Sequence, residues 1–139
     1  MITLLGSVLL VAAMPQAGAV MQPTEAMALA DARRGRGVTG TFEMTVAAAQ
    51  RTREALYLNS NADYRSPDDL TFRLTPQAAR KLQEKLGAAP ETALIGRTVR
   101  VKGMLKLMPI VNVINGTPRS YNRLQHEVSV RSLSNLTVE

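Results

Sequence analysis

The sequence predicts an all-β domain with one helix, in which five strands form an antiparallel sheet or a small barrel. Three observations carry this prediction: strict alternation over residues 97–107, a capped amphipathic helix over residues 76–86, and an Asn115-Gly116 hairpin signal. The expected order is strand, strand, strand, helix, strand, strand, with an extended hairpin joining the last two strands. At 139 residues, the chain has the length of a single domain.

Three strands are expected before the helix. The first covers residues 38–47 and is rich in threonine, and the next two cover residues 55–59 and 70–74. Residues 48–53 break the alternation, and the Asn, Asp and Pro residues within 60–69 are typical of a turn. The prediction therefore has three strands joined by two loops.

The helix has suitable residues at both ends. Thr75 can accept hydrogen bonds from the free amides of the first turn, and Pro76 has no N–H to leave unpaired there. Gly87 suits the left-handed conformation that ends many helices. Leu82 and Leu86 form a narrow apolar stripe, so this helix is expected to pack on the sheet.

Apolar and cationic side chains alternate along the strand that follows the helix. Because side chains on a strand point to opposite faces in turn, one face is apolar and the other is cationic. The apolar set is Val99, Val101 and Leu105, and the cationic set is Arg100, Lys102 and Lys106. The cationic face fits a solvated surface that discourages aggregation, and for Arg100 and Lys102 it equally fits a binding surface.

The last two strands form the expected hairpin. Pro109 predicts a bulge or a sheet edge, with the strand resuming over residues 111–114. Asn115-Gly116 suits a turn in which both central residues have positive φ. The return strand is expected over residues 119–130, followed by a turn at residues 132–135.

The first residues have the pattern of a secretory signal peptide. An apolar run from Leu4 to Met14 precedes Ala17-Gly18-Ala19, which fits cleavage after Ala19. A buried or membrane-anchoring helix is the alternative, but the run is shorter than the roughly twenty residues needed to span a bilayer. We expect export to the bacterial periplasm or the cell exterior.

Residues 20–37 are expected to be a partly ordered linker with a short helix, and residues 38–139 the barrel. Thr24 could cap the short helix, and Gly35 could end it. The chain has no cysteine, so the exported form must be stabilised by packing without disulfides. Its net charge of +6 fits either binding to polyanions or a well-solvated surface.

Two segments carry a resemblance to a known family. Residues 56–60, Leu-Tyr-Leu-Asn-Ser, lead to Asp-Tyr-Arg-Ser-Pro at 63–67, and residues 95–103 read Ile-Gly-Arg-Thr-Val-Arg-Val-Lys-Gly. With the strand order, these segments resemble small exported bacterial domains of the oligonucleotide/oligosaccharide-binding (OB) fold, largely uncharacterised. The resemblance covers residues 38–138 and implies a Greek-key barrel. The long stretch 107–122 departs from it.

In such a barrel, one face would combine arginines with aromatic and amide side chains. A basic groove with an aromatic platform suits single-stranded nucleic acid or an acidic polysaccharide, although five aromatic residues give little stacking capacity. The candidate ligand-binding residues are Arg51, Arg53, Tyr57, Asn59, Arg73, Arg119, Tyr121 and Arg123.

A second candidate surface is the apolar stretch in the hairpin. If it projects from the barrel, Met108, Ile110, Val111 and Ile114 would form a patch for a protein partner or a second copy of the chain. Burial of this stretch against the barrel or the short helix is the alternative.

The sequence shows no pattern typical of catalysis. It has no cysteine, a single histidine at position 126, and no recognisable nucleophile, metal or phosphate-binding motif, so we expect no catalytic residue, metal or cofactor. The sequence therefore predicts a noncatalytic exported module that engages a protein partner or acts as a scaffold. Polyanion binding through the arginine-rich face is the alternative.

Overall fold

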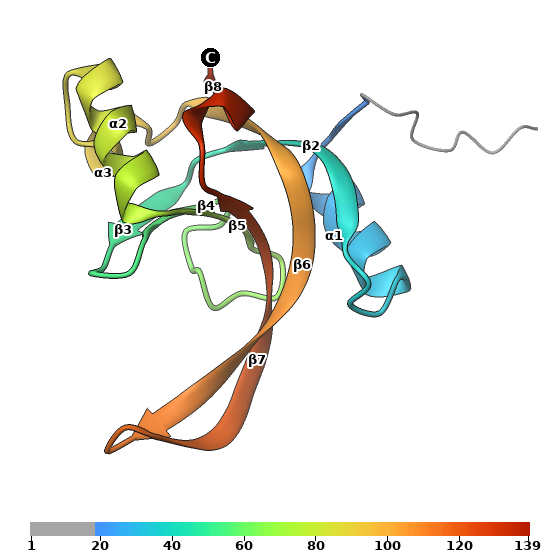
Figure 1. The fold of residues 1–139 in the computed structure, drawn as a ribbon. Helices are drawn as coiled ribbons and strands as arrows, with labels where there is room; N and C mark the ends of the chain where they lie inside the picture. Colours follow the sequence, from blue (N-terminus) through green and yellow to red (C-terminus); the bar gives the residue numbers. More distant parts are fainter. Residues whose placement is uncertain (1–18) are drawn as a thin grey trace, which may run out of the picture.

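The computed structural model describes residues 19–139, and for Tyr121 only the backbone. Eight strands form one mixed sheet (Figure 1). The strands are β1 (Val20–Met21), β2 (Val38–Thr45), β3 (Ala48–Arg51), β4 (Leu56–Asn59), β5 (Leu70–Leu74), β6 (Thr98–Ile114), β7 (Thr117–Val130) and β8 (Leu136–Val138). The helices are α1 (Pro23–Ala32), α2 (Pro76–Leu86) and α3 (Pro90–Ala93), with a 3-10 turn at Leu133–Asn135.

The prediction of a five-stranded Greek-key barrel with one helix is wrong. The strands follow the order β1-β2-β6-β7-β5-β4-β3, with β8 beside β6, and no ladder joins β2 to β3 to close the sheet. Residues 48–53 do not alternate, so their pattern did not indicate β3. This strand lies at an edge of the sheet, where it needs hydrogen bonds on only one side. The four residues of α3 are too few to show a helical period.

Helix α2 confirms its predicted bounds and caps. The Thr75 hydroxyl accepts a hydrogen bond from the Ala78 amide at 3.2 Å. Gly87 ends the helix with φ +69°. Leu82 is buried in the core, as expected for a helix that packs on the sheet.

The alternation in β6 also places its side chains as predicted. Val99, Val101 and Leu105 are fully buried, while Lys102 and Lys106 are exposed on the other face. Arg100 lies on the exposed side, where its guanidinium pairs with the Glu43 carboxylate at 2.6 Å and with Glu139 at 3.0 Å. These ion pairs give Arg100 a structural role between neighbouring strands.

Residues 20–37 are more ordered than the predicted linker. Strand β1 pairs parallel to β2, and α1 buries Ala26, Met27 and Ala30 against the core. The Met21 side chain lies over Gly40, where a Cβ would come within 2.5 Å of its terminal methyl carbon. The helix begins at Pro23 without a side-chain cap, so the predicted capping role of Thr24 is wrong. Residues 1–18, which hold nearly all of the predicted signal peptide, lie outside the described residues.

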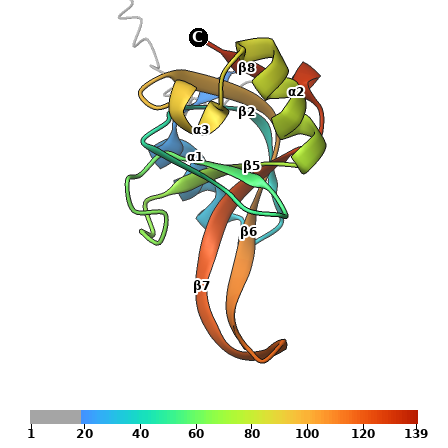
Figure 2. The ribbon, with the colours of Figure 1, turned by 90° about the vertical axis from the view of Figure 1, so that its left-hand side faces the viewer.

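The hairpin turn is confirmed, with φ +53° at Asn115 and φ +77° at Gly116. Strand β6 pairs with β2 only as far as Leu105, and beyond that point it pairs with β7 alone. Pro109 lies opposite Leu124 in this free part of the ladder, which confirms the predicted edge. The free part projects from the rest of the molecule (Figure 2). We call residues 108–124 the arm and the remaining described residues the body.

Candidate functional site

All four residues predicted to form an apolar patch lie on the arm. Met108, Val111 and Ile114 are exposed, and Ile110 is half-buried. The part of the chain that the structure describes has eight exposed large hydrophobic residues, and five of them lie on the arm. The arm therefore carries most of these exposed hydrophobic residues.

One face of the arm continues the core face of the sheet. Strand β6 keeps its alternation, so Leu105, Val111 and Val113 point to the same side. Their exposed fractions rise from 0% at Leu105 to 42% at Val111 and 59% at Val113. The covering that buries this face in the body is therefore absent along the arm.

The two strands of the arm are held together by more than the ladder. The Asn112 amide donates to the Ser120 hydroxyl at 2.8 Å, and the Asn122 amide donates to the Asn112 oxygen at 3.3 Å. Register shifts follow Ile110 and Asn112, and at each shift β7 carries one unpaired residue. Such bulges bend a hairpin, and the arm is visibly bent in Figure 2.

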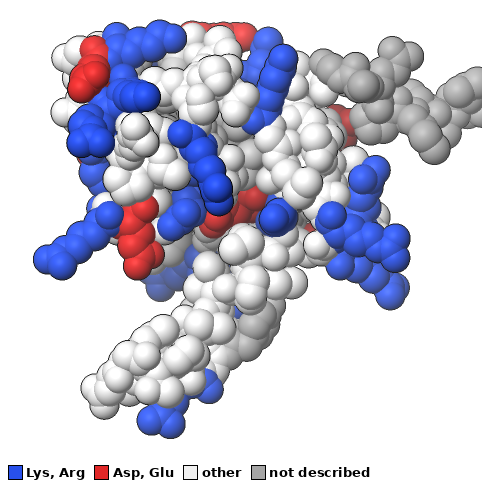
Figure 3. Space-filling model, viewed as in Figure 1, with Lys and Arg blue, Asp and Glu red and all other residues white. Residues whose placement is uncertain are grey.

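The arm carries few charges. Residues 107–118 contain no charged side chain, and residues 107–126 contain no Asp or Glu. Arg119 and Arg123 are its only cations. In Figure 3 the arm is accordingly a mostly uncharged projection below a body that carries many cations.

A hollow of about 230 Å³ lies where the arm joins the body. It brings together three of the predicted ligand-binding residues, Tyr57, Asn59 and Arg123, and Arg73 lies over the Tyr57 ring, 5.9 Å from its centre. The residues that line it are Gln50, Tyr57, Asn59, Tyr64, Ile110, Arg123, Gln125 and Glu127.

A buried carboxyl supports one wall of this hollow. Asp69 is only 2% exposed, and burial raises its pKa to about 6. One of its oxygens accepts from the Asn61 amide at 2.9 Å, and the other lies 2.7 Å from the Thr71 hydroxyl oxygen. That hydroxyl is also 3.0 Å from the Asn59 side-chain oxygen. Because a hydroxyl has one proton, Thr71 donates to only one of these two oxygens at a time.

A second carboxylate lies within the hollow. Arg123 donates to the Gln125 oxygen at 3.0 Å, and the Gln125 amide donates to Glu127 at 3.0 Å. Burial raises the pKa of the Glu127 carboxyl. Among residues 19–139, no cation forms an ion pair with Glu127. A carboxylate at this position opposes the binding of a phosphate or sulfate group in the hollow.

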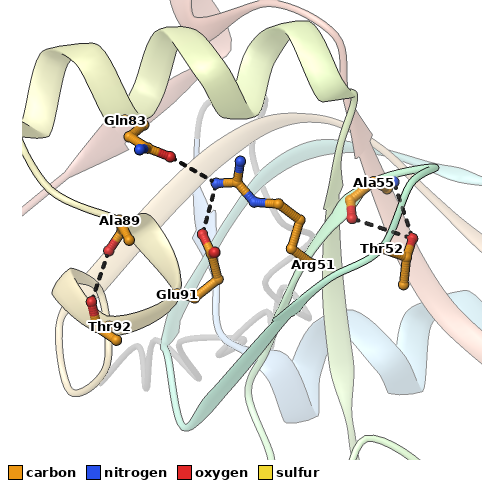
Figure 4. A network of polar contacts seen from close by, with 7 residues as sticks. All are labelled: Arg51, Thr52, Ala55, Gln83, Ala89, Glu91 and Thr92. Carbon is orange, nitrogen blue, oxygen red and sulfur yellow. Dashed lines mark hydrogen bonds and ion pairs between the residues drawn. The ribbon is translucent and has the colours of Figure 1, made fainter.

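The other predicted ligand-binding residues lie apart from the hollow. Arg51 points toward α2 and α3, where it pairs with Glu91 at 2.7 Å and donates to Gln83 at 3.2 Å (Figure 4). Arg53 is exposed in the loop after β3, and Arg119 is exposed on the arm. The side chain of Tyr121 lies outside the described part of the structure. The eight residues therefore do not form one continuous groove.

Sequence reasoning missed several residues at the base of the arm. His126 contacts Asp31 of α1 at 2.7 Å, which ties the first helix to β7. The long polar side chains at 123, 125 and 127 alternate along β7, and this spacing was a usable signal for a shared polar face. Tyr64 reaches the site from a loop, where Arg123 lies over its ring at 5.4 Å, and no sequence pattern indicates that contact.

None of the described helices is long and apolar enough to cross a membrane. No protein-family model matches the chain, and no curated protein matches it in sequence. The resemblance to exported bacterial domains therefore stays a prediction, and any functional conclusion depends on the geometry of the arm and its base.

Proposed function

We propose that this protein is a noncatalytic, exported binding module that engages a protein partner through the arm. The observation that carries the proposal is the uncovered face of the arm, which continues the core face of the sheet out to Val113. Contiguous exposed apolar surface on a small protein marks an interaction site. Export is supported by the signal-peptide pattern in residues 1–19.

The fold does not require the arm. The buried core consists of residues in the body, and no residue of the arm belongs to it. A two-stranded hairpin with exposed apolar side chains adds little stability of its own. A role outside the folding of the body therefore accounts better for this surface.

Removal of the arm tests the proposal. Replacement of residues 109–124 by Asn-Gly would join Met108 to Gln125, which are opposite each other in the ladder, through a two-residue turn. We expect the shortened protein, tagged and expressed in its own host, to keep its circular dichroism spectrum and lose the protein that copurifies with the full chain. Ile95→Ser, at an exposed apolar residue of the body, is the matched control.

Retention of the same copurifying protein by the shortened chain would contradict the proposal. An unfolded spectrum would instead call for the substitutions Val113→Ser and Ile114→Ser, which leave the backbone of the arm in place. The arm proposal fails if that double variant also keeps the protein at wild-type yield.

Polyanion binding is a second candidate, favoured by one basic cluster. Arg33, Arg34 and Arg36 are exposed at the turn after α1, and none of them forms an ion pair within the described residues. We expect such binding to appear as salt-sensitive retention on heparin or single-stranded DNA that is weakened when the three arginines are changed to glutamine. Absence of retention at low salt would eliminate this candidate.

A further inference from the structure

We propose that the partner is a different protein that encloses the arm in an uncharged groove and places carboxylates near Arg119. This inference rests on the proposed function and names the partner by its shape and charge. Four observations support it: the size of the arm, its two apolar faces, its blocked edges and its cations.

The arm is too small for a stable contact on one face alone. The seven residues 108–114 extend about 23 Å, and two paired strands are roughly 10 Å wide, which gives about 230 Å² per face. A stable interface buries about 800 Å² on each partner. Two arms laid face to face therefore fall several-fold short, and a groove that contacts both faces and the tip comes much closer.

Both faces of the arm would gain from enclosure. Val111 and Val113 lie on the face that continues the core, and Met108 and Ile110 lie on the opposite face. Docking on a flat surface would leave one of these pairs in water. A groove buries both pairs, and each buried apolar Å² contributes roughly 25 cal/mol.

The edges of the arm are unsuited to pairing with an added strand. Pro109 and Pro118 have no N–H to donate, and β7 bulges at Arg119 and Asn122, the residues left out of the ladder. Prolines and bulges at a sheet edge discourage edge-to-edge pairing. The partner therefore recognises side chains rather than extending the sheet.

The charge of the arm disfavours a second copy and favours an acidic partner. The arm has two arginines and no carboxylate, so two identical arms would bring like charges together. Arg123 is already engaged by Gln125 and Tyr64, whereas Arg119 is exposed near the tip. Arg119 is therefore the cation available to carboxylates at the rim of the groove.

Photo-crosslinking in the native host tests the enclosure. Benzoylphenylalanine is introduced at Val113 on one face and at Met108 on the other, with Ile95 of the body as control. We expect the same protein, different from this chain, to be crosslinked from both arm positions and not from Ile95. A product from one face alone, or a product with the mass of two copies, would overturn the enclosure.

Absence of any product from the arm would instead contradict the proposed function. Failure of the enclosure and failure of the proposed function therefore give different results.

The acidic rim is tested by Arg119→Glu, which should reduce crosslinking from Val113 about tenfold through charge repulsion. Arg53→Glu makes the same charge change at an exposed residue of the body. Equal yields from Arg119→Glu and Arg53→Glu would refute the acidic rim.

Discussion

Strands β6 and β7 run through both the body and the arm, but the same face of the sheet is buried in the body and exposed in the arm. In the body, Leu105 of β6 and Val128 of β7 are fully buried under the core. A few residues further along β6, Val113 is 59% exposed on the same face. The change occurs beyond Leu105, the last residue of β6 that pairs with β2. The apolar alternation of β6 and β7 therefore serves packing in one region and is available for recognition in the other.

The largest expected effect comes from a core residue of the body. Phe72 is fully buried and belongs to the core cluster. We expect Phe72→Ala to reduce the free energy of unfolding by about 3–5 kcal/mol, because it removes buried apolar area and leaves a cavity. Thermal and urea unfolding would measure this loss. A loss under about 1 kcal/mol would show that the core is far looser than its burial indicates.

A second effect concerns pH and also belongs to the body, because the arm has no carboxyl or histidine. The pKa of Asp69 is about 6 in the folded chain against 3.8 in the unfolded chain, so the folded state binds its proton more tightly. Stability should therefore fall as pH rises from about 4 to about 6 and then level off. The total change is about 3 kcal/mol.

Asp69→Asn isolates this contribution. Its amide can donate to Thr71 as the protonated carboxyl does, but it does not titrate. Unfolding free energies of the variant and the wild type should differ increasingly in favour of the variant as pH rises from about 4 to about 6, and the difference should be constant above that. A constant difference between the two proteins would show that folding does not shift the pKa of Asp69.

A third, smaller effect tests a local contact of the body. Thr75 caps α2 through the Ala78 amide, so Thr75→Ala should cost about 1 kcal/mol of unfolding free energy. Thr24→Ala is the matched control, since α1 has no side-chain cap. Urea midpoints of the two variants would separate them. Equal losses would mean that the Thr75 cap contributes nothing beyond the loss of a hydroxyl.

Elements encoded by neighbouring residues could be predicted from the sequence. The ends of α2, the turn at Asn115-Gly116 and the two faces of β6 each depend on a few adjacent residues. The docking of β1 and α1 could not be predicted, because it depends on contacts with β2 and the core that are distant in sequence. Strand β3 was missed for a similar reason, since its pairing with β4 rather than its own pattern makes it a strand.

The candidate site also has one part that the sequence predicts and one part that only the fold brings together. The apolar run of the hairpin identified Met108, Ile110, Val111 and Ile114 as surface candidates, because their polarity and spacing are local properties. The hollow at the base of the arm combines residues from β3, β4, β7 and a loop. Its carboxylate, Glu127, opposes the anion binding expected of an arginine-lined face. Only the assembled sheet shows that Glu127 lies together with that face.

The smallest expected change in stability belongs to the arm, where Val113→Ser and Ile114→Ser replace exposed side chains. Because both residues are already in water, the unfolding free energy of the double variant should stay within about 0.5 kcal/mol of the wild type. Its copurifying partner should nevertheless be lost. Urea unfolding and copurification yield would be measured on the same preparation. A stability loss approaching that of Phe72→Ala would mean that the isolated chain covers this face itself, which would remove the difference between arm and body.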